Sequence, residues 1–152
     1  MERAVVVAVA GSGDADADTL HVAEDLGAAL AEAGFTVLTG GLGGVMEAAS
    51  RGARSKLGHT IGILPGGDPE DANGWVELAI PTGMGEQRNA LVAQAGRALV
   101  AVGRGYGTLS EIAMALKNGR PVIGLGSWDI EGLQPAESVE DAVARLVALL
   151  RA

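Results

Sequence analysis

Three glycine-rich segments contain the residue types that bind phosphate. They are Gly11-Ser12-Gly13, Gly40-Gly41-Leu42-Gly43-Gly44 and Gly103-Arg104-Gly105-Tyr106-Gly107, and each follows a run of apolar residues. Glycine lets a ligand approach backbone N–H groups, and a helix that begins after such a loop offers unpaired N–H groups and the positive end of its dipole. The segments therefore predict a site for a small anion. For the third segment the alternative is a tight turn in which glycine only supplies positive φ angles.

Arg88 lies where a cation is electrostatically unfavourable. The pattern predicts a helix over residues 86–95, so Arg88 falls in its first turn, at the positive end of the dipole. This costs a few tenths of a kcal/mol unless the side chain faces an anion. Two interpretations stay open, an arginine that contacts an anionic ligand and an arginine that is merely solvated.

Several common active-site patterns are missing. The first segment lacks the third glycine of the dinucleotide-binding fingerprint, and no Gly-Lys-Ser/Thr occurs, which argues against nicotinamide oxidoreductases and P-loop NTPases. A serine nucleophile would need a histidine partner, but His21 falls on the outer face of a predicted helix and His59 at the entry of a predicted strand. Neither histidine is expected near the glycine segments.

Asp14, Asp16 and Asp18 form an acidic cluster directly after the first glycine segment. Carboxylates suit Mg²⁺, bound directly or through water. Aspartate is equally common in polar turns and at helix N-caps. We predict no metal site, with Asp18 or Thr19 as the N-cap, and the magnesium alternative stays open.

Alternating strands and helices must position these groups. The sequence predicts an α/β protein of three-layer Rossmann-like type, with a mainly parallel sheet and helices on both faces. The three glycine segments then converge at the carboxyl edge if the strand over 97–102 lies next to the first strand. The segment 65–74 is either a wall of the site or a surface excursion. We predict strands over 3–10, 35–39, 59–64, 75–80, 98–102 and 120–125, and helices over 18–33, 45–57, 86–95, 108–118 and 138–150.

Length and composition limit the classes of protein. The length of 152 residues predicts a single domain over 1–152. Glycine accounts for 24 of these residues, a share well above the usual ~7%. The absence of cysteine fits a reducing compartment, so we expect a cytoplasmic protein. A net charge of −8 without a basic run argues against nucleic acid and anionic membranes as partners. The apolar run 4–10 is interpreted as a buried strand and not as a signal peptide.

The segment Gly105-Tyr106-Gly107-Thr108-Leu109-Ser110-Glu111 resembles the Pro-Gly-Gly-x-Gly-Thr-x-x-Glu motif of the LOG family of phosphoribohydrolases. Arg88 matches the arginine of that family's Arg-Lys pair, and Gly40-Gly41 with Met46 and the segment 61–65 also look like family segments. The chain is most similar to a subgroup of short proteins that includes the molybdenum cofactor carrier protein. That similarity lies in Gly-Thr-Leu-Ser-Glu-Ile at 107–112 and Gly-Glu-x-Arg-Asn at 85–89.

The resemblance implies two functions. In the hydrolases, the residues that match Arg88 and Glu111 are catalytic. The reaction of these enzymes cleaves the N-glycosidic bond of a nucleoside 5′-monophosphate. In the carrier, a phosphorylated pterin is bound without turnover. The pair Arg88 and Glu111 favours the enzyme. Two departures favour the carrier: Gly103-Arg104 replaces the leading Pro-Gly of the motif, and Asn89 replaces the lysine.

The main prediction is that the protein binds a phosphorylated small molecule of nucleoside-monophosphate type and requires no cofactor. Hydrolysis of the N-glycosidic bond of this ligand is left open. The alternative is a non-catalytic carrier or sensor that binds a nucleotide, a pterin or molybdenum cofactor. The resemblance also implies a homodimer or higher homo-oligomer. The predicted catalytic residues are Arg88 and Glu111, and the predicted ligand-binding residues are Gly11, Ser12, Gly13, Gly40, Gly41, Gly43, Gly44, Arg88, Asn89, Gly103, Arg104, Gly105, Tyr106, Gly107 and Thr108.

Overall fold

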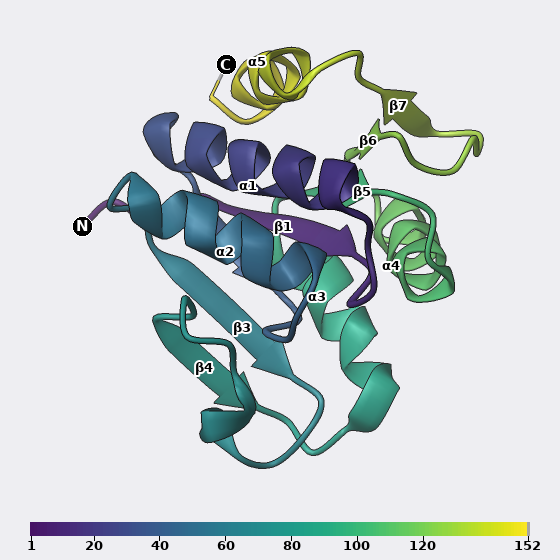
Figure 1. Cartoon of the computed structure of the whole chain (residues 1–152). Helices are drawn as coiled ribbons and strands as arrows, with labels where there is room; N and C mark the ends of the chain where they lie inside the picture. The colour runs from purple at the N-terminus through teal and green to yellow at the C-terminus, as the bar shows by residue number, and fades with distance from the viewer. Residues whose placement is uncertain (152) are drawn as a thin grey trace.

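The computed structural model describes residues 1–151 as a seven-stranded parallel sheet covered by helices on both faces (Figure 1). This confirms the predicted three-layer Rossmann-like fold class. The strand order is β4-β3-β2-β1-β5-β6-β7. The elements are β1 Val6–Gly11, α1 Ala17–Glu32, β2 Thr36–Thr39, α2 Val45–Ser55, β3 Thr60–Leu64, η1 Pro69–Asp71, β4 Leu78–Pro81, η2 Gly85–Arg88, α3 Asn89–Ala95, β5 Ala98–Val102, α4 Tyr106–Lys117, β6 Val122–Leu125, β7 Leu133–Pro135 and α5 Val139–Leu150.

The strand order reverses beside β1. Val7 of β1 pairs with Val37 of β2 on one side and with Ala98 of β5 on the other. All five residues of β5 are buried, as expected for a central parallel strand. Loops that leave adjacent strands in opposite directions open a crevice at such a point, which is where ligands bind in open α/β sheets.

Two apolar layers hold the helices on the sheet. One layer joins α1, α2 and α5 to one face, and the other joins α3 and α4 to the opposite face. The helices α1 and α2 cross at two glycines. A Cβ atom on Gly27 would lie 1.9 Å from the Ala49 carbonyl oxygen, and one on Gly52 would lie 1.9 Å from the Glu24 carbonyl oxygen. The two helix backbones are therefore in direct contact.

Three local predictions were wrong. The predicted helix 86–95 is a 3₁₀ turn, η2, followed by α3, so Arg88 lies at the junction of two elements. The turn-rich segment 126–137 contains β7, whose three residues include a proline at its end and give no alternating pattern. Asp16, not Asp18 or Thr19, caps α1, because its carboxylate accepts a hydrogen bond of 2.8 Å from the Thr19 N–H.

None of the helices between residues 1 and 151 is long and apolar enough to cross a membrane.

Candidate functional site

A cleft of about 300 Å³ opens at the carboxyl edge of the sheet, where the strand order reverses. Its walls come from the loops after β1 and β2, the end of β3, the η2–α3 junction and the start of α4. Sequence segments separated by up to about a hundred residues therefore meet at one place. The predicted site residues that line this cleft are Gly11, Ser12, Gly13, Arg88, Asn89, Gly105, Tyr106, Gly107, Thr108 and Glu111.

The start of α4 has the properties of an anion cradle. Gly105 is the N-cap and no side chain caps the helix, so the first N–H groups, from Tyr106 onward, lack a side-chain partner. A Cβ atom on Gly107 would meet only the Asn89 side chain, at 3.8 Å, so the helix start is open toward the cleft. The Thr108 side chain is 2% exposed and its Oγ1 has no hydrogen-bond partner. A buried hydroxyl without a partner is costly, and an anion in the cleft would satisfy it.

Replacing Thr108 with valine is expected to separate stability from binding. Removal of the partnerless hydroxyl is expected to raise the free energy of unfolding by about 1 kcal/mol. The same change should weaken binding of inorganic phosphate by about 10-fold, because a hydrogen bond to a charged group is lost. Urea unfolding and equilibrium dialysis measure the two effects.

The control is Thr60→Val. Thr60 is fully buried, but its Oγ1 donates to the Trp75 carbonyl oxygen at 2.6 Å and accepts from the Glu77 N–H at 2.9 Å. Its removal should lower stability by about 1–3 kcal/mol and leave phosphate binding unchanged. Equal destabilisation by both variants would contradict the assignment of the Thr108 hydroxyl to a ligand.

Two glycines of the first two segments allow the loops to pack against each other. A Cβ atom on Gly11 would lie 2.3 Å from Val45 Cγ1. Gly44 has φ +65°, and a Cβ atom there would lie 2.3 Å from the Ser12 carbonyl oxygen, which accepts from the Val45 N–H at 3.0 Å. Of the predicted binding residues in the second segment, Gly40, Gly41, Gly43 and Gly44 do not line the cleft, whereas Leu42 does.

Gly40 makes room for Arg88. A Cβ atom on Gly40 would lie 2.6 Å from Arg88 Nη2, and this nitrogen donates to the Gly40 carbonyl oxygen at 3.4 Å. Nη1 donates to the Asn89 side-chain oxygen, and the buried Nε has no partner. Because Arg88 is only 8% exposed, the interpretation as a solvated arginine is wrong. The guanidinium is a fixed positive charge in the wall of the cleft.

Glu111 faces the same cleft and is 7% exposed. Burial raises the pKa of its carboxyl to about 8, although the positive charge of Arg88 acts in the opposite direction. Burial also lowers the pKa of Arg88, while Glu111 and Glu86 raise it. The Glu111 carboxyl is therefore mostly protonated at neutral pH, and a protonated carboxyl can donate a hydrogen bond to a ligand.

Asn89 stands where the LOG motif has a lysine, and it links Arg88 to α4. Its side-chain nitrogen donates to Ser110 Oγ at 3.4 Å, and Ser110 Oγ donates to the Gly107 carbonyl oxygen at 2.7 Å. The asparagine thus orients the arginine without adding a second charge.

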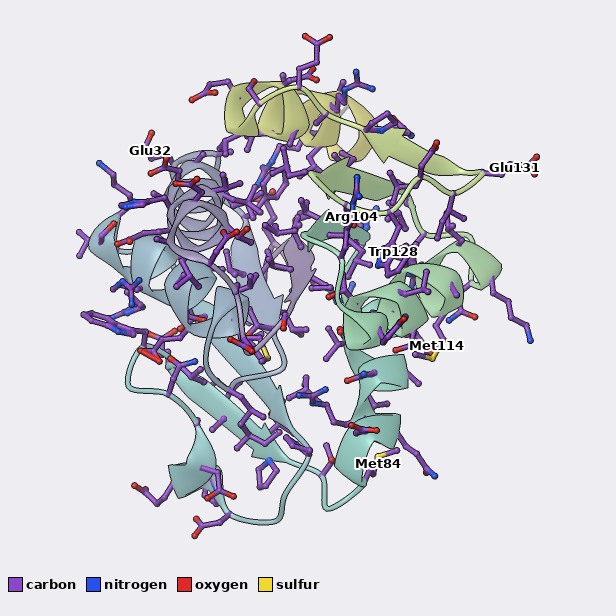
Figure 2. The ribbon with its side chains drawn as sticks, turned by 45° about the vertical axis from the view of Figure 1, so that its right-hand side comes forward. Glu32, Met84, Arg104, Met114, Trp128 and Glu131 are labelled. Atoms are coloured by element: carbon purple, nitrogen blue, oxygen red, sulfur yellow. The ribbon has the colours of Figure 1, made fainter. Side chains whose placement is uncertain are left out.

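No sequence pattern indicated an aromatic support behind the cradle. Trp128, from the connection between β6 and β7, donates to the Gly105 carbonyl oxygen at 3.2 Å, and its ring stacks on Tyr106 with centroids 6.0 Å apart. Arg104 donates to the Ser127 carbonyl oxygen at 3.3 Å. Arg104 and Trp128 lie next to each other above the start of α4 (Figure 2). Met46 and Glu86, which line the cleft, were also absent from the predicted site.

Of the acidic cluster at 14–18, the Asp16 carboxylate is used locally. The hydrogen bonds from Thr19 that make Asp16 the N-cap also lower the pKa of its carboxyl. The Asp14 N–H donates to Ser12 Oγ at 3.0 Å. Within the described 151 residues, no group of three or more histidine, cysteine or acidic side chains is placed to hold a metal ion.

Comparisons with known proteins identify the family. The sequence model of the SLOG cluster4 family, LDcluster4, matches residues 4–148. The chain belongs to the SLOG cluster4 family. An uncharacterized protein from Archaeoglobus fulgidus is 43% identical over 138 residues, which are 90% of this chain and 91% of the relative.

Two solved structures are similar to this SLOG cluster4 chain over nearly its whole length. The molybdenum cofactor binding protein from Rippkaea orientalis is 34% identical and has a TM-score of 0.91, with 99% of both chains covered. The molybdenum cofactor carrier protein from Chlamydomonas reinhardtii is 36% identical with a TM-score of 0.89, covering 99% of this chain and 100% of that one. These matches confirm the predicted resemblance to the short subgroup.

Proposed function

We propose that this protein is a carrier that binds a phosphorylated pterin of the molybdenum cofactor type and releases it chemically unchanged. The observation that carries this proposal is the partnerless, buried Thr108 hydroxyl at the uncapped start of α4. The likeness to two proteins that bind molybdenum cofactor, over nearly the whole of each chain, supports the same ligand class. This favours the carrier, which was the alternative at the level of sequence, over the hydrolase.

The residues present fit such a ligand. The backbone N–H groups of Tyr106 and Gly107, together with Thr108, would hold the phosphate ester, and Arg88 would balance its charge. Met46 and Leu42 supply apolar surface for a ring. The chain has no cysteine, so a carried metal would keep the ligands that it brings with it.

The environment of Arg88 also suits binding better than turnover. The guanidinium is held by the Gly40 carbonyl oxygen and by Asn89, which fixes its position. With Asn89 in place of lysine, the cleft has one cation fewer than the hydrolase motif provides.

Hydrolysis of a nucleoside 5′-monophosphate is the second candidate, favoured by Glu111. A carboxyl with a pKa of about 8 holds a proton at neutral pH and could pass it to the departing base. Water would attack C1′ as the bond between C1′ and the base nitrogen breaks, and the proton lost by the water would return to the Glu111 carboxylate, giving free base and ribose 5-phosphate. Incubation with AMP and chromatography for adenine tests this candidate, and Glu111→Gln should abolish any release.

Loading and transfer of the cofactor test the carrier. The protein is incubated without oxygen with molybdenum cofactor released from a molybdoenzyme, passed over a gel-filtration column and mixed with a cofactor-free molybdoenzyme. We expect co-elution and restoration of the enzyme's activity, with retention about 10-fold weaker for Thr108→Val. Thr60→Val should load like the unaltered protein. Absence of co-elution at concentrations that load a known carrier would contradict the proposal.

A further inference from the structure

A second cavity, of about 270 Å³, lies between the starts of α1 and α5 and the ends of β5 and β6. Figure 1 shows α5 alongside α1, and the two helices share one apolar layer. Val22, Val102, Leu125 and Val139 give this α1–α5 cavity an apolar lining. Its size and apolar surface suit a flat organic ring.

Two carboxylates without partners stand at this cavity. Asp18 and Glu137 both line it and are exposed, and across the 151 described residues neither side chain forms a hydrogen bond or an ion pair. The Ser138 hydroxyl is already used, since it accepts from the Asp141 N–H at 3.0 Å. No lysine or arginine lines the cavity. A phosphate is therefore unsuited to it, whereas a ring that carries N–H donors would pair with the carboxylates.

A further cavity lies between the α1–α5 cavity and the phosphate cradle. This middle cavity, of about 320 Å³, shares Thr19, Val102 and Gly103 with the α1–α5 cavity, and shares Ser12 and Gly105 with the cleft. Gly103 and Gly105 are two residues apart, so their Cα atoms lie within about 7 Å of each other. The three cavities therefore lie next to one another along the carboxyl edge of the sheet.

The middle cavity is lined by charges of both signs. A phosphate that follows the one in the cradle is therefore favoured only beside the cation. Arg104 contributes a cation beside the cradle. Asp14 and Asp16 also line the cavity, but the Asp16 carboxylate already accepts from the Thr19 N–H. A pyrophosphate would therefore remain on the side of Arg104 and Gly105.

We propose that the α1–α5 cavity binds the second ring of a ligand with two ring systems joined by pyrophosphate. The first ring occupies the cleft beside Arg88 and Glu111, and the pyrophosphate crosses the cradle. Asp18 and Glu137 accept hydrogen bonds from neighbouring N–H donors on the second ring, as on the edge of guanine. Doubly wound sheets bind two-headed ligands across the point where the strand order reverses. This inference rests on the proposed function, because it requires a phosphate at the start of α4.

Equilibrium binding to four probes tests the inference. They are neopterin 3′-monophosphate, GMP, diguanosine pyrophosphate and diadenosine pyrophosphate. We expect diguanosine pyrophosphate to bind at least about 10-fold more tightly than GMP and than the diadenosine compound, which lacks the paired N–H donors. The double variant Asp18→Asn with Glu137→Gln should weaken the binding of diguanosine pyrophosphate by about 10-fold and change the binding of GMP by less than about 2-fold.

The control is Glu140→Gln, an exposed acidic residue in the first turn of α5 that lines neither cavity. It should leave all affinities unchanged, and thermal unfolding should show that every variant folds. If neopterin monophosphate binds but the double variant does not change the affinity for diguanosine pyrophosphate, the proposal of a second ring site is wrong and the carrier proposal stands. If no phosphorylated probe binds, both are wrong.

Discussion

Replacing Glu111 with glutamine is expected to remove a large pH dependence of stability. The carboxyl has a pKa of about 8 in the folded protein, against 4.5 in the unfolded chain. Between these values the folded state holds a proton that the unfolded state has released, so the free energy of unfolding falls as the pH rises. The full loss, reached above pH 8, is about 5 kcal/mol. Glutamine carries no titrating proton, so the variant should be similar to the unaltered protein near pH 5 and clearly more stable at pH 9.

Urea unfolding at pH 5, 7 and 9 measures this effect. The control is Glu131→Gln, because the Glu131 side chain is exposed and points away from the protein (Figure 2). It should follow the pH dependence of the unaltered protein. Parallel curves for Glu111→Gln and the unaltered protein would show that the Glu111 carboxyl ionises normally.

Gly27→Ala and Gly52→Ala are expected to destabilise the fold strongly. In most helices alanine is favoured over glycine by about 1 kcal/mol. Here the added methyl group would lie 1.9 Å from a carbonyl oxygen of the neighbouring helix in both cases. The helices must separate along their length to admit it, and overpacking of this kind costs about 3 kcal/mol. The sign of the effect is therefore opposite to the one that helix propensity predicts.

Denaturant unfolding of each single variant tests this prediction. Gly74→Ala serves as the control, because nothing lies within 4 Å of a Cβ atom on Gly74. It should change stability by less than about 0.5 kcal/mol. Unchanged or increased stability in Gly27→Ala would contradict the direct contact between the backbones of α1 and α2.

The sheet and the cradle could be predicted because their signals are local. The apolar run before Gly103 predicted the strand over 98–102 with the bounds that the structure has. Parallel strands bring all their exit loops to one edge, so the convergence of the first and third glycine segments also followed from the pattern. The alternation of strands and helices predicted the parallel sheet, whereas the position of β5 beside β1 was a condition that the structure meets.

The state of the buried charges could not be predicted, since it depends on distant residues. Arg88 is buried because Gly40, far away in the sequence, leaves space for its guanidinium. The raised pKa of Glu111 comes from its burial in the folded protein, which no short motif encodes. Trp128 lies in an irregular segment, so nothing in its neighbours indicated that its ring supports the cradle.

The central claim is that the start of α4 binds the phosphate of a phosphorylated ring compound. Thermal unfolding with neopterin 3′-monophosphate, and with neopterin, tests it most directly. A ligand at 100 times its Kd stabilises the folded state by about 2.7 kcal/mol. We predict a rise in Tm that requires the phosphate ester, is much smaller in Thr108→Val and is retained in Glu131→Gln. Equal shifts with both compounds, or no shift with either, would contradict the phosphate cradle.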